Sequence, residues 1–322
     1  MTLSFDSPRF SVRNADFDDL DATLERVGHV VIDDLWNTGF LTWLFQGAQN
    51  LFAQYDERYG EHLDELPAST VNHYKGNSVN LGSLFEFDPQ WHEKSADADR
   101  RFFGEIERTG ITALLRHLLA GDHVVGRSER VIRRSVPTAP TGYVGLHADG
   151  QLEVCSSQGF RSKRELTLWT PLQDCSGDDT PRLLLFRRGE PMLRGMDSIK
   201  LGSFQHAENE KLTGSHLDAQ FDQVYAQRAC YAPPVRLGGA ILFMSDVVHG
   251  SYRRSTMTVP RYSLDCRAVG AYRVTGANRN YQGVRFGIAD VPGLMWSLHP
   301  RHAVTFGRQV ASKLKRMAAS LA

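Results

Sequence analysis

The first third of the chain has a hydrophobic pattern that is typical of helices. Apolar residues recur at helical spacing over 40–55 and over 96–120, as they do in helices that bury one face. The segment 18–27 begins with two aspartates and ends before Gly28, a residue suited to the position just after a helix. The apolar run 29–32 predicts a short strand. The pattern therefore predicts a helical N-terminal region that contains one strand.

After about residue 123 the pattern changes to short strands. Short apolar or alternating runs follow one another, separated by Gly, Pro, Asp and Ser, and this pattern is typical of a β-barrel or β-sandwich. The predicted strands are 130–136, 143–147, 165–172, 182–186, 240–244 and 263–268. A polar stretch over 189–228 interrupts them, and 304–321 has the spacing of a surface helix.

Composition narrows the classes of function. Lys and Arg together number 37, as do Asp and Glu, so the formal net charge of the 322 residues is zero. A protein that reads nucleic acid usually has a basic surplus, so we expect no nucleic-acid partner. The chain has neither a signal-peptide pattern nor a run of the ~20 apolar residues that span a membrane. We therefore expect a cytoplasmic protein with no membrane partner.

The four cysteines are widely spaced and form no Cys-x-x-Cys pair. They are Cys155, Cys175, Cys230 and Cys266. In a chain of this length, such cysteines are expected to be reduced residues of the core or of strands, and not a disulfide framework or a zinc site.

The motif with the clearest chemistry is His-x-Asp, which can supply two of the three ligands of a 2-His-1-carboxylate iron site. In a strand, residues two apart point to the same face, so this His and Asp can bind one metal ion. The chain has three such pairs. They are His62 with Asp64, His147 with Asp149, and His216 with Asp218.

The surrounding residues favour the pair at His147. It follows the strand-like run 143–146, after turn residues, whereas His62 lies in a charged stretch without a strand signal. His216 follows Ser215 at the start of a helical pattern, where Asp218 is more simply a helix-start carboxylate.

A second histidine must complete the site, and His249 has the right context. It comes just after the apolar strand 240–244 and begins a further strand. The separation of 102 residues from His147 leaves room for the strands that lie between the two halves of a jelly-roll metal site. Only 33 residues separate His216 from His249, which is too few for about five strands.

At this point the sequence resembles the phytanoyl-CoA dioxygenase-like family of Fe(II)/2-oxoglutarate-dependent oxygenases. The resemblance runs in order through ERVGHVVIDDL, LHADG, LTLWTPLQDCSGDDTPRLLLFRRGE and GGAILFMSDVVHGS. These blocks lie within about two thirds of the chain. The family's usual Pro-Gly-Ser-His turn reads Arg-Arg-Gly-Glu here, at 187–190, which is a departure on the substrate side of the site.

The resemblance implies a mainly β fold in one oxygenase domain over 1–322. Its core would be a double-stranded β-helix, or jelly roll, over about 123–275. Helices from the N-terminal region, 1–122, and from the C-terminal extension, 276–322, would flank this core. The polar stretch of about 189–228 is longer than a jelly-roll turn requires. We expect it to form a lid over the substrate pocket, with a short helix from Ser215 to about Arg228.

The resemblance also implies the chemistry. His147, Asp149 and His249 would bind Fe(II), with 2-oxoglutarate as co-substrate and O2 as oxidant. A small molecule would be hydroxylated or otherwise oxidised, with release of succinate and CO2. Because Asp149 is present, we do not expect the halogenating variant, in which a small residue replaces the carboxylate.

Further residues follow from the same resemblance. Arg261, 12 residues after His249, would bind the distal carboxylate of 2-oxoglutarate, since a guanidinium donates two parallel hydrogen bonds to a carboxylate. Ser251, Ser263 and Trp169 match or neighbour positions around the co-substrate. We expect surface charges at Arg253, Arg254 and Arg267. Arg267 lies roughly 20 Å along the strand from Arg261 and is expected to leave the pocket.

Two alternatives remain open from the residues. One is a cupin-type jelly-roll metalloenzyme that binds another metal and no 2-oxoglutarate. The other is a non-catalytic relative that keeps the barrel as a ligand-binding module. A site without a carboxylate co-substrate would not need Arg261, and a dead site would have no reason to keep all three metal ligands.

Overall fold

The computed structural model describes residues 3–59, 78–119, 123–137, 165–188, 229–270 and 283–285, with the backbone alone at 59, 123–129, 269–270 and 283–285. Its helices are α1 (Phe17–Val27), α2 (Thr38–Tyr59), α4 (Trp91–Arg108) and α5 (Ile111–Leu118), with a short 3-10 turn, η2 (Leu81–Ser83). Its strands are β1 (Arg9–Ser11), β2 (His29–Asp33), β3 (Ser78–Asn80), β4 (His123–Ser135), β5 (Glu165–Pro171), β6 (Arg182–Phe186), β7 (Cys230–Tyr231), β8 (Ala240–Met244), β9 (His249–Tyr252), β10 (Arg261–Gly270) and β11 (Gly283–Arg285).

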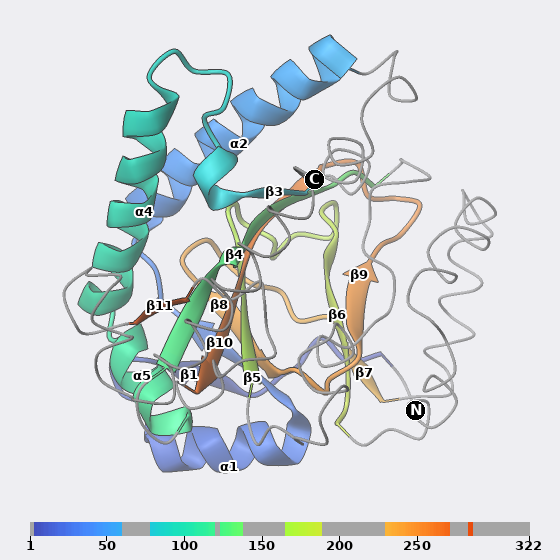
Figure 1. Ribbon diagram of the computed structural model, residues 1–322. Helices are drawn as coiled ribbons and strands as arrows, with labels where there is room; N and C mark the ends of the chain where they lie inside the picture. Colours follow the sequence, from blue (N-terminus) through green and yellow to red (C-terminus); the bar gives the residue numbers. More distant parts are fainter. Residues whose placement is uncertain are drawn as a thin grey trace, which may run out of the picture.

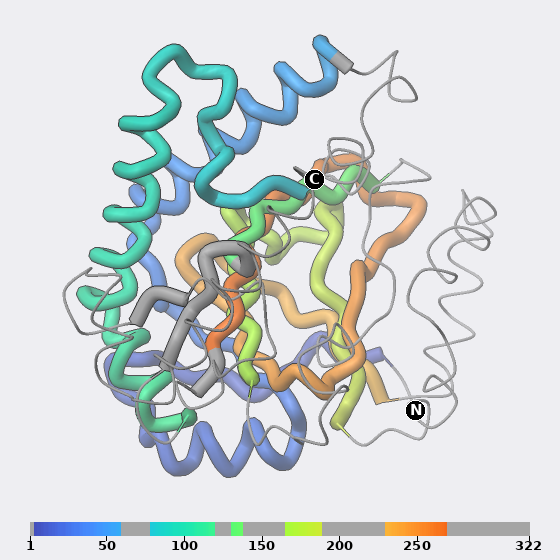
Figure 2. The backbone as a smooth tube through the Cα atoms, viewed as in Figure 1, coloured from blue at the N-terminus to red at the C-terminus, as the bar shows by residue number. Residues whose placement is uncertain are grey.

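The strands form two sheets. The large sheet has the order β1-β2-β8-β5-β10-β4-β11, with β3 paired to β4, and the small sheet has the order β7-β6-β9. Neighbouring strands are antiparallel except β1 and β2. Figure 1 shows α2 and α4 on one side of the large sheet and the strands of the small sheet on the other. The same layering is visible in the backbone trace of Figure 2.

The side chains of strand β10 alternate between the two faces of the large sheet. Successive side chains of a strand point to opposite sides. Tyr262 packs against the aromatic rings of Phe45 and Phe52, which belong to α2, so the even-numbered positions face the helices. The odd-numbered Arg261 donates a hydrogen bond to the backbone of β6, so the odd-numbered positions face the small sheet. The polar residues of β10 therefore line the space between the sheets.

The helices and the turn before α2 are held to the large sheet by apolar packing and by several polar contacts. Leu44, Phe52 and Phe102 are almost fully buried in the same core as Leu264. The indole of Trp36 donates a hydrogen bond of 2.9 Å to the hydroxyl of Thr170 on β5. Arg130 of β4 pairs with Asp99 of α4 at 2.7 Å, and its guanidinium lies over the rings of Phe102 and Phe103. A buried arginine is tolerated there because both a carboxylate and aromatic faces contact it.

Glycines set the helix boundaries. Gly28 ends α1 at φ +92°, and a Cβ atom there would come within 2.6 Å of Val247 and 2.9 Å of Arg188. The prediction of one helix over 96–120 is wrong, because Gly110 separates α4 from α5 at φ +81°. A left-handed residue ends the α-helical path, and glycine adopts that conformation at little cost.

The N-terminal region contributes more strands than the sequence predicts. The predicted strand 29–32 is confirmed as β2, which pairs with β8 in the large sheet. Two further three-residue strands, β1 and β3, were not predicted and join β2 and β4. In segments this short, the hydrophobic pattern is too brief to distinguish a strand from a loop.

The described cysteines agree with the sequence. Cys175, Cys230 and Cys266 are buried and free of disulfides, while Cys155 lies outside the described residues. Burial raises the pKa of the Cys175 thiol to about 12, so this residue behaves as a small apolar side chain. No helix among the described residues is both long enough and apolar enough to cross a membrane.

One buried histidine makes a pH dependence of stability predictable. His29 of β2 is fully buried, with Nε2 3.0 Å from the Ser7 hydroxyl and its ring against Tyr231. Burial lowers the pKa of His29 from 6.5 to about 4. Between these values the unfolded chain binds a proton that the folded chain does not. The contribution of His29 is therefore complete above pH 6.5 and declines as the pH falls towards 4, by on the order of 3 kcal/mol in total.

We expect His29→Gln to remove this component of the pH dependence, because glutamine does not titrate. The measurement is the free energy of unfolding in urea at pH 7 and at pH 4.5, with a chelator present, for both proteins. The wild type should lose more stability than the variant over this range. If both proteins lost the same free energy of unfolding, His29 would take up its proton at the same pH in the folded and unfolded states.

Candidate functional site

A cavity lies between the two sheets, and several polar side chains line it. From the large sheet it is lined by Arg133, Thr167, Trp169, Phe243, Arg261, Asp265 and Arg267, and from the small sheet and its turn by Leu183, His249, Gly250 and Ser251. Its free space is only about 30 Å³, so a ligand of several carbon atoms has to displace side chains.

Strand register explains why these residues meet. Thr167 lies directly between Phe243 on β8 and Arg267 on β10, so the three side chains form one row across the large sheet. Trp169 and Asp265 face each other in the next row. Because directly opposed residues share a face, the register alone brings these side chains to one side of the sheet.

His249 lies at the start of β9 and faces this cavity. Its side chain is only 6% exposed, and its ring lies 4.5 Å from that of Phe243, centroid to centroid. Its Nδ1 atom is 3.0 Å from the backbone oxygen of Val247. Since a carbonyl only accepts, Nδ1 carries the proton and donates it, and Nε2 is the ring nitrogen with which a neutral imidazole could bind a metal. His249 is thus held in the tautomer and orientation that a metal ligand requires.

The turn before His249 is held in place from two sides. Val247 packs against Gly28, where no side chain could be added. Arg188 forms ion pairs with Glu25 of α1 and with Asp246, the latter at 2.8 Å. Arg188 therefore has a structural role, because it ties α1 to the turn that carries His249.

Arg261 faces the same cavity from the first position of β10. Its side chain is almost completely buried, and its guanidinium lies 5.3 Å from the centre of the Trp169 ring. One terminal nitrogen donates to the backbone oxygen of Arg182 at 2.8 Å, and the other lies 3.4 Å from the Ser251 hydroxyl. Within the described residues its Nε has no acceptor.

Burial is the main cause that lowers the pKa of Arg261, and the positive charges of Arg133 and Arg253 act in the same direction. Arginine stays charged even so, and a buried cation without a full set of acceptors is costly. A carboxylate bound in the cavity would supply the missing acceptors and the opposite charge.

The other predicted co-substrate residues lie around Arg261. Trp169 and Ser251 line the cavity, whereas Ser263 is fully buried and is not among the lining residues. The Ser263 hydroxyl lies 3.5 Å from a carboxylate oxygen of Asp265. The roles of these three residues stay predictions.

For two of the three arginines, the expectation of a surface charge is wrong. Arg267 lines the cavity, because it shares the interior face of β10 with Arg261 and the cavity extends along that strand. Arg253 is 1% exposed, since it directly follows the buried strand β9. Arg254 is half-buried, with its Nε 3.1 Å from the Tyr252 hydroxyl.

Sequence reasoning also missed one polar pair of the cavity. The Nε of Arg133 on β4 donates to Asp265 at 2.5 Å, and a terminal nitrogen donates to Ser78 at 2.9 Å. The signal available in the sequence was a set of charged residues within two alternating strands, RVIRRS and RYSLDCR. Charges on the interior face of a strand usually need partners there.

The two other predicted metal ligands, His147 and Asp149, lie outside the described residues, as do the predicted lid of 189–228 and the C-terminal helix of 304–321. Among the residues that the structure describes, no three His, Cys, Asp or Glu side chains are grouped to hold a metal. His249 alone of the three proposed ligands is placed, and its buried, hydrogen-bonded imidazole fits the role.

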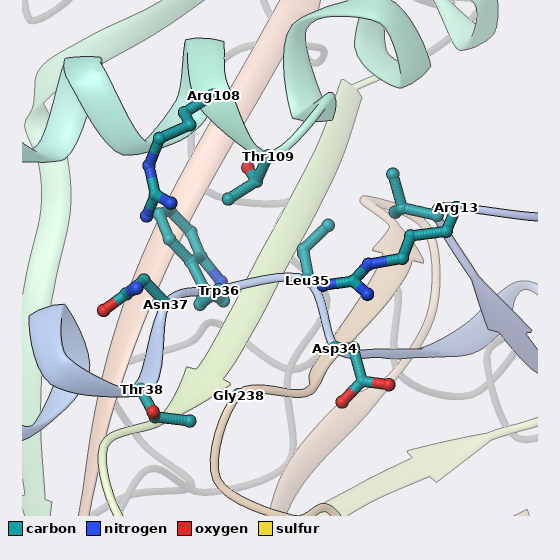
Figure 3. A pocket seen from close by; sticks show the side chains of 10 residues that line it. Arg13, Asp34, Leu35, Trp36, Asn37, Thr38, Arg108, Thr109 and Gly238 are labelled. Carbon is teal, nitrogen blue, oxygen red and sulfur yellow. The ribbon is translucent and has the colours of Figure 1, made fainter.

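A second cavity, of about 530 Å³, lies on the helix side of the molecule, between the turn that precedes α2 and the junction of α4 with α5 (Figure 3). It is larger, but its charged residues Arg13, Asp34 and Arg108 are exposed to solvent. Solvated charges do not require a ligand, whereas the buried charges between the sheets do require partners. The smaller cavity is therefore the candidate functional site.

Comparisons with known proteins show the fold of this chain but do not show its family. No protein-family model matches the chain, and no curated protein sequence matches it. Among solved structures it is similar to EctD from S. alaskensis with 2-oxoglutarate and 5-hydroxyectoine, at 15% identity and a TM-score of 0.51, covering 92% of this chain and 89% of that one.

Two further solved structures are less similar. The epimerase SnoN in complex with Fe3+, alpha ketoglutarate and nogalamycin RO has 17% identity and a TM-score of 0.47, covering 79% of this chain and 84% of that one. The non-heme alpha ketoglutarate dependent carbocyclase SnoK has 14% identity and a TM-score of 0.45, with 83% and 88% covered. At such identities the similarity to EctD shows a shared fold, and the phytanoyl-CoA dioxygenase-like family is not shown.

Proposed function

We propose that this protein is a non-haem Fe(II)/2-oxoglutarate-dependent oxygenase that oxidises a small molecule. Its sheets would form the double-stranded β-helix of that class. The observation that carries the proposal is the placement of His249 and Arg261 in one buried cavity, with Trp169 and Ser251 beside the guanidinium. This combination provides a metal ligand and a carboxylate anchor that face the same space.

The proposed iron ligands are His147, Asp149 and His249. When bound, Fe(II) in a 2-His-1-carboxylate site supplies open positions at which 2-oxoglutarate and O2 react, giving succinate and CO2. The protein contributes orientation. The carbonyl of Val247 fixes the His249 ring, and Nε2 would be the atom that binds the ion.

Arg261 is proposed to hold the distal carboxylate of 2-oxoglutarate. The face of Trp169 and the carbonyl of Arg182 fix the plane of the guanidinium. A fixed fork leaves fewer orientations to be lost on binding than a flexible cation would. The Ser251 hydroxyl lies beside one terminal nitrogen and can donate to the same carboxylate.

The sharpest test of this function is the spectrum of the anaerobic protein with Fe(II) and 2-oxoglutarate. Chelation of the iron by the co-substrate gives a weak visible charge-transfer band, which we expect for the wild-type protein. A cupin-type metalloenzyme without 2-oxoglutarate, or a ligand-binding relative without iron, would give no such band. Succinate formation on admission of O2 then separates an active oxygenase from a binding protein.

A further inference from the structure

The cavity on the helix side of the molecule, shown in Figure 3, has the size of a small-molecule site. Its volume of about 530 Å³ lies within the range of ~300–1,000 Å³ that is usual for such sites. The charged side chains around it are exposed and do not require a ligand, but arginines at a concave surface can bind an anion reversibly.

Two arginines bring hydrogen-bond donors to this cavity. Arg13 follows β1 and has no hydrogen-bond or ion-pair partner within the described part of the chain. Arg108, in the last turn of α4, uses one terminal nitrogen to pair with Glu105, and an ion pair at the surface contributes little. A guanidinium has five N–H donors, so both residues keep donors for a ligand.

The two guanidinium groups reach the cavity from different sides. In Figure 3, Arg108 and Arg13 lie on either side of Trp36 and Leu35, whose side chains line the cavity between them. Both apolar side chains are almost fully buried, so this part of the wall is fixed by the core. A molecule with an anionic group at each end and an apolar middle matches this order of cation, apolar surface and cation.

The remaining charges of the lining act in opposite directions. The N-terminus of α2, capped by Asn37, adds a positive partial charge, and the C-terminus of α4 adds a negative one. These two helix ends offset each other, so the formal charges decide which ligands bind. Arg13 and Arg108 attract an anion, whereas the carboxylate of Asp34 opposes it.

We propose that this cavity binds a small organic dicarboxylate, with one carboxylate at Arg13 and the other at Arg108. A guanidinium suits each end, because its fork donates two parallel hydrogen bonds to a carboxylate. This site is separate from the cavity between the sheets, and the proposal does not depend on the oxygenase function.

The test is calorimetry of the whole chain with adipate, a six-carbon dicarboxylate. Hexanoate has one carboxylate, adipamide has none, and phenyl phosphate carries its charge at one end only. We expect adipate to bind and the other three probes to bind more weakly, by roughly threefold or more.

Three variants locate the binding and test its sign. Arg13→Gln and Arg108→Gln should each weaken adipate binding by roughly threefold or more, because each removes one cation. Asp34→Asn should tighten it, since it removes the opposing charge. Asparagine also adopts the left-handed backbone that Asp34 has at φ +55°, so this variant keeps the turn.

Arg100→Gln is the matched control for Arg108→Gln. Arg100 lies on the same helix and pairs with Asp97, three residues earlier, as Arg108 pairs with Glu105, but it is not among the residues that line the cavity. Arg100→Gln should bind adipate as the wild type does, and thermal unfolding checks that every variant is folded.

Several outcomes would overturn the proposal. They are a wild type that does not bind adipate, hexanoate, adipamide or phenyl phosphate that binds as tightly as adipate, and folded Arg13→Gln and Arg108→Gln proteins with unchanged affinity. Weaker binding by Asp34→Asn would also overturn it, because the cavity would then favour a cationic group. None of these results bears on the oxygenase proposal, which concerns the other cavity.

Discussion

Replacement of His147, Asp149 or His249 by alanine is expected to abolish turnover while the protein stays folded. Each residue is a proposed ligand of one ion, so the loss of any one lowers affinity for both the metal and the co-substrate. For His249 the structure adds a physical reason, since its buried ring is aligned by the Val247 carbonyl and packed on Phe243. The measurements are succinate formation, iron content and thermal unfolding.

The other two His-x-Asp pairs provide the controls for this prediction. His62→Ala and His216→Ala should retain activity and iron. A folded His216→Ala protein that is inactive, together with an active His147→Ala protein, would show that the wrong pair had been assigned to the metal. Loss of iron without loss of the thermal transition would distinguish a missing ligand from a misfolded chain.

Much of the strand pattern could be predicted because core strands carry a simple signal. The strands over 182–186 and 240–244 have the predicted bounds, since each contains an apolar run, over 183–186 and 240–244, and is buried on both faces. The break at Gly110 was missed because both α4 and α5 keep apolar residues at helical spacing on either side of it.

The site was harder to predict from sequence, because strand distance alone does not decide which side chains share a cavity. Arg267 was expected to leave the pocket on the basis of strand rise, yet the cavity extends along β10 and includes it. The pairing of Arg133 with Asp265 depends on the register between β4 and β10, which no local pattern specifies. By contrast, His249, named from its sequence context, and Ser251, Trp169 and Arg261, named from the resemblance, all line one cavity, while their roles stay predictions.

Replacement of Arg261 is expected to weaken the binding of 2-oxoglutarate strongly. The distal carboxylate of 2-oxoglutarate must leave water on entering the cavity, and a buried carboxylate without a partner costs several kcal/mol. Arg261 is buried, has an unsatisfied Nε within the described residues, and is held over Trp169. We expect Arg261→Ala to raise the KM for 2-oxoglutarate by roughly 10–1000-fold, which corresponds to the ~1.4–4 kcal/mol of a lost charge-assisted partner.

Two further variants separate charge from packing at this position. Arg261→Lys should recover only some of the affinity, because a point charge cannot reproduce the two parallel hydrogen bonds of the fork. Arg261→Met keeps an unbranched side chain over Trp169 without the charge, so it should fold and still show the raised KM. Arg236→Ala removes an exposed arginine and should leave the KM unchanged.

The outcome at Arg261 also decides between the proposed function and its nearest rival. A cupin-type enzyme has no dicarboxylate to anchor, so its turnover would not depend on the guanidinium fork. If folded Arg261→Ala and Arg261→Met proteins keep the wild-type KM for 2-oxoglutarate, the co-substrate does not bind in the cavity that His249 and Arg261 line. The buried arginine would then serve the fold, through the Arg182 carbonyl and the Trp169 ring, and a cupin-type metal site would account better for the cavity.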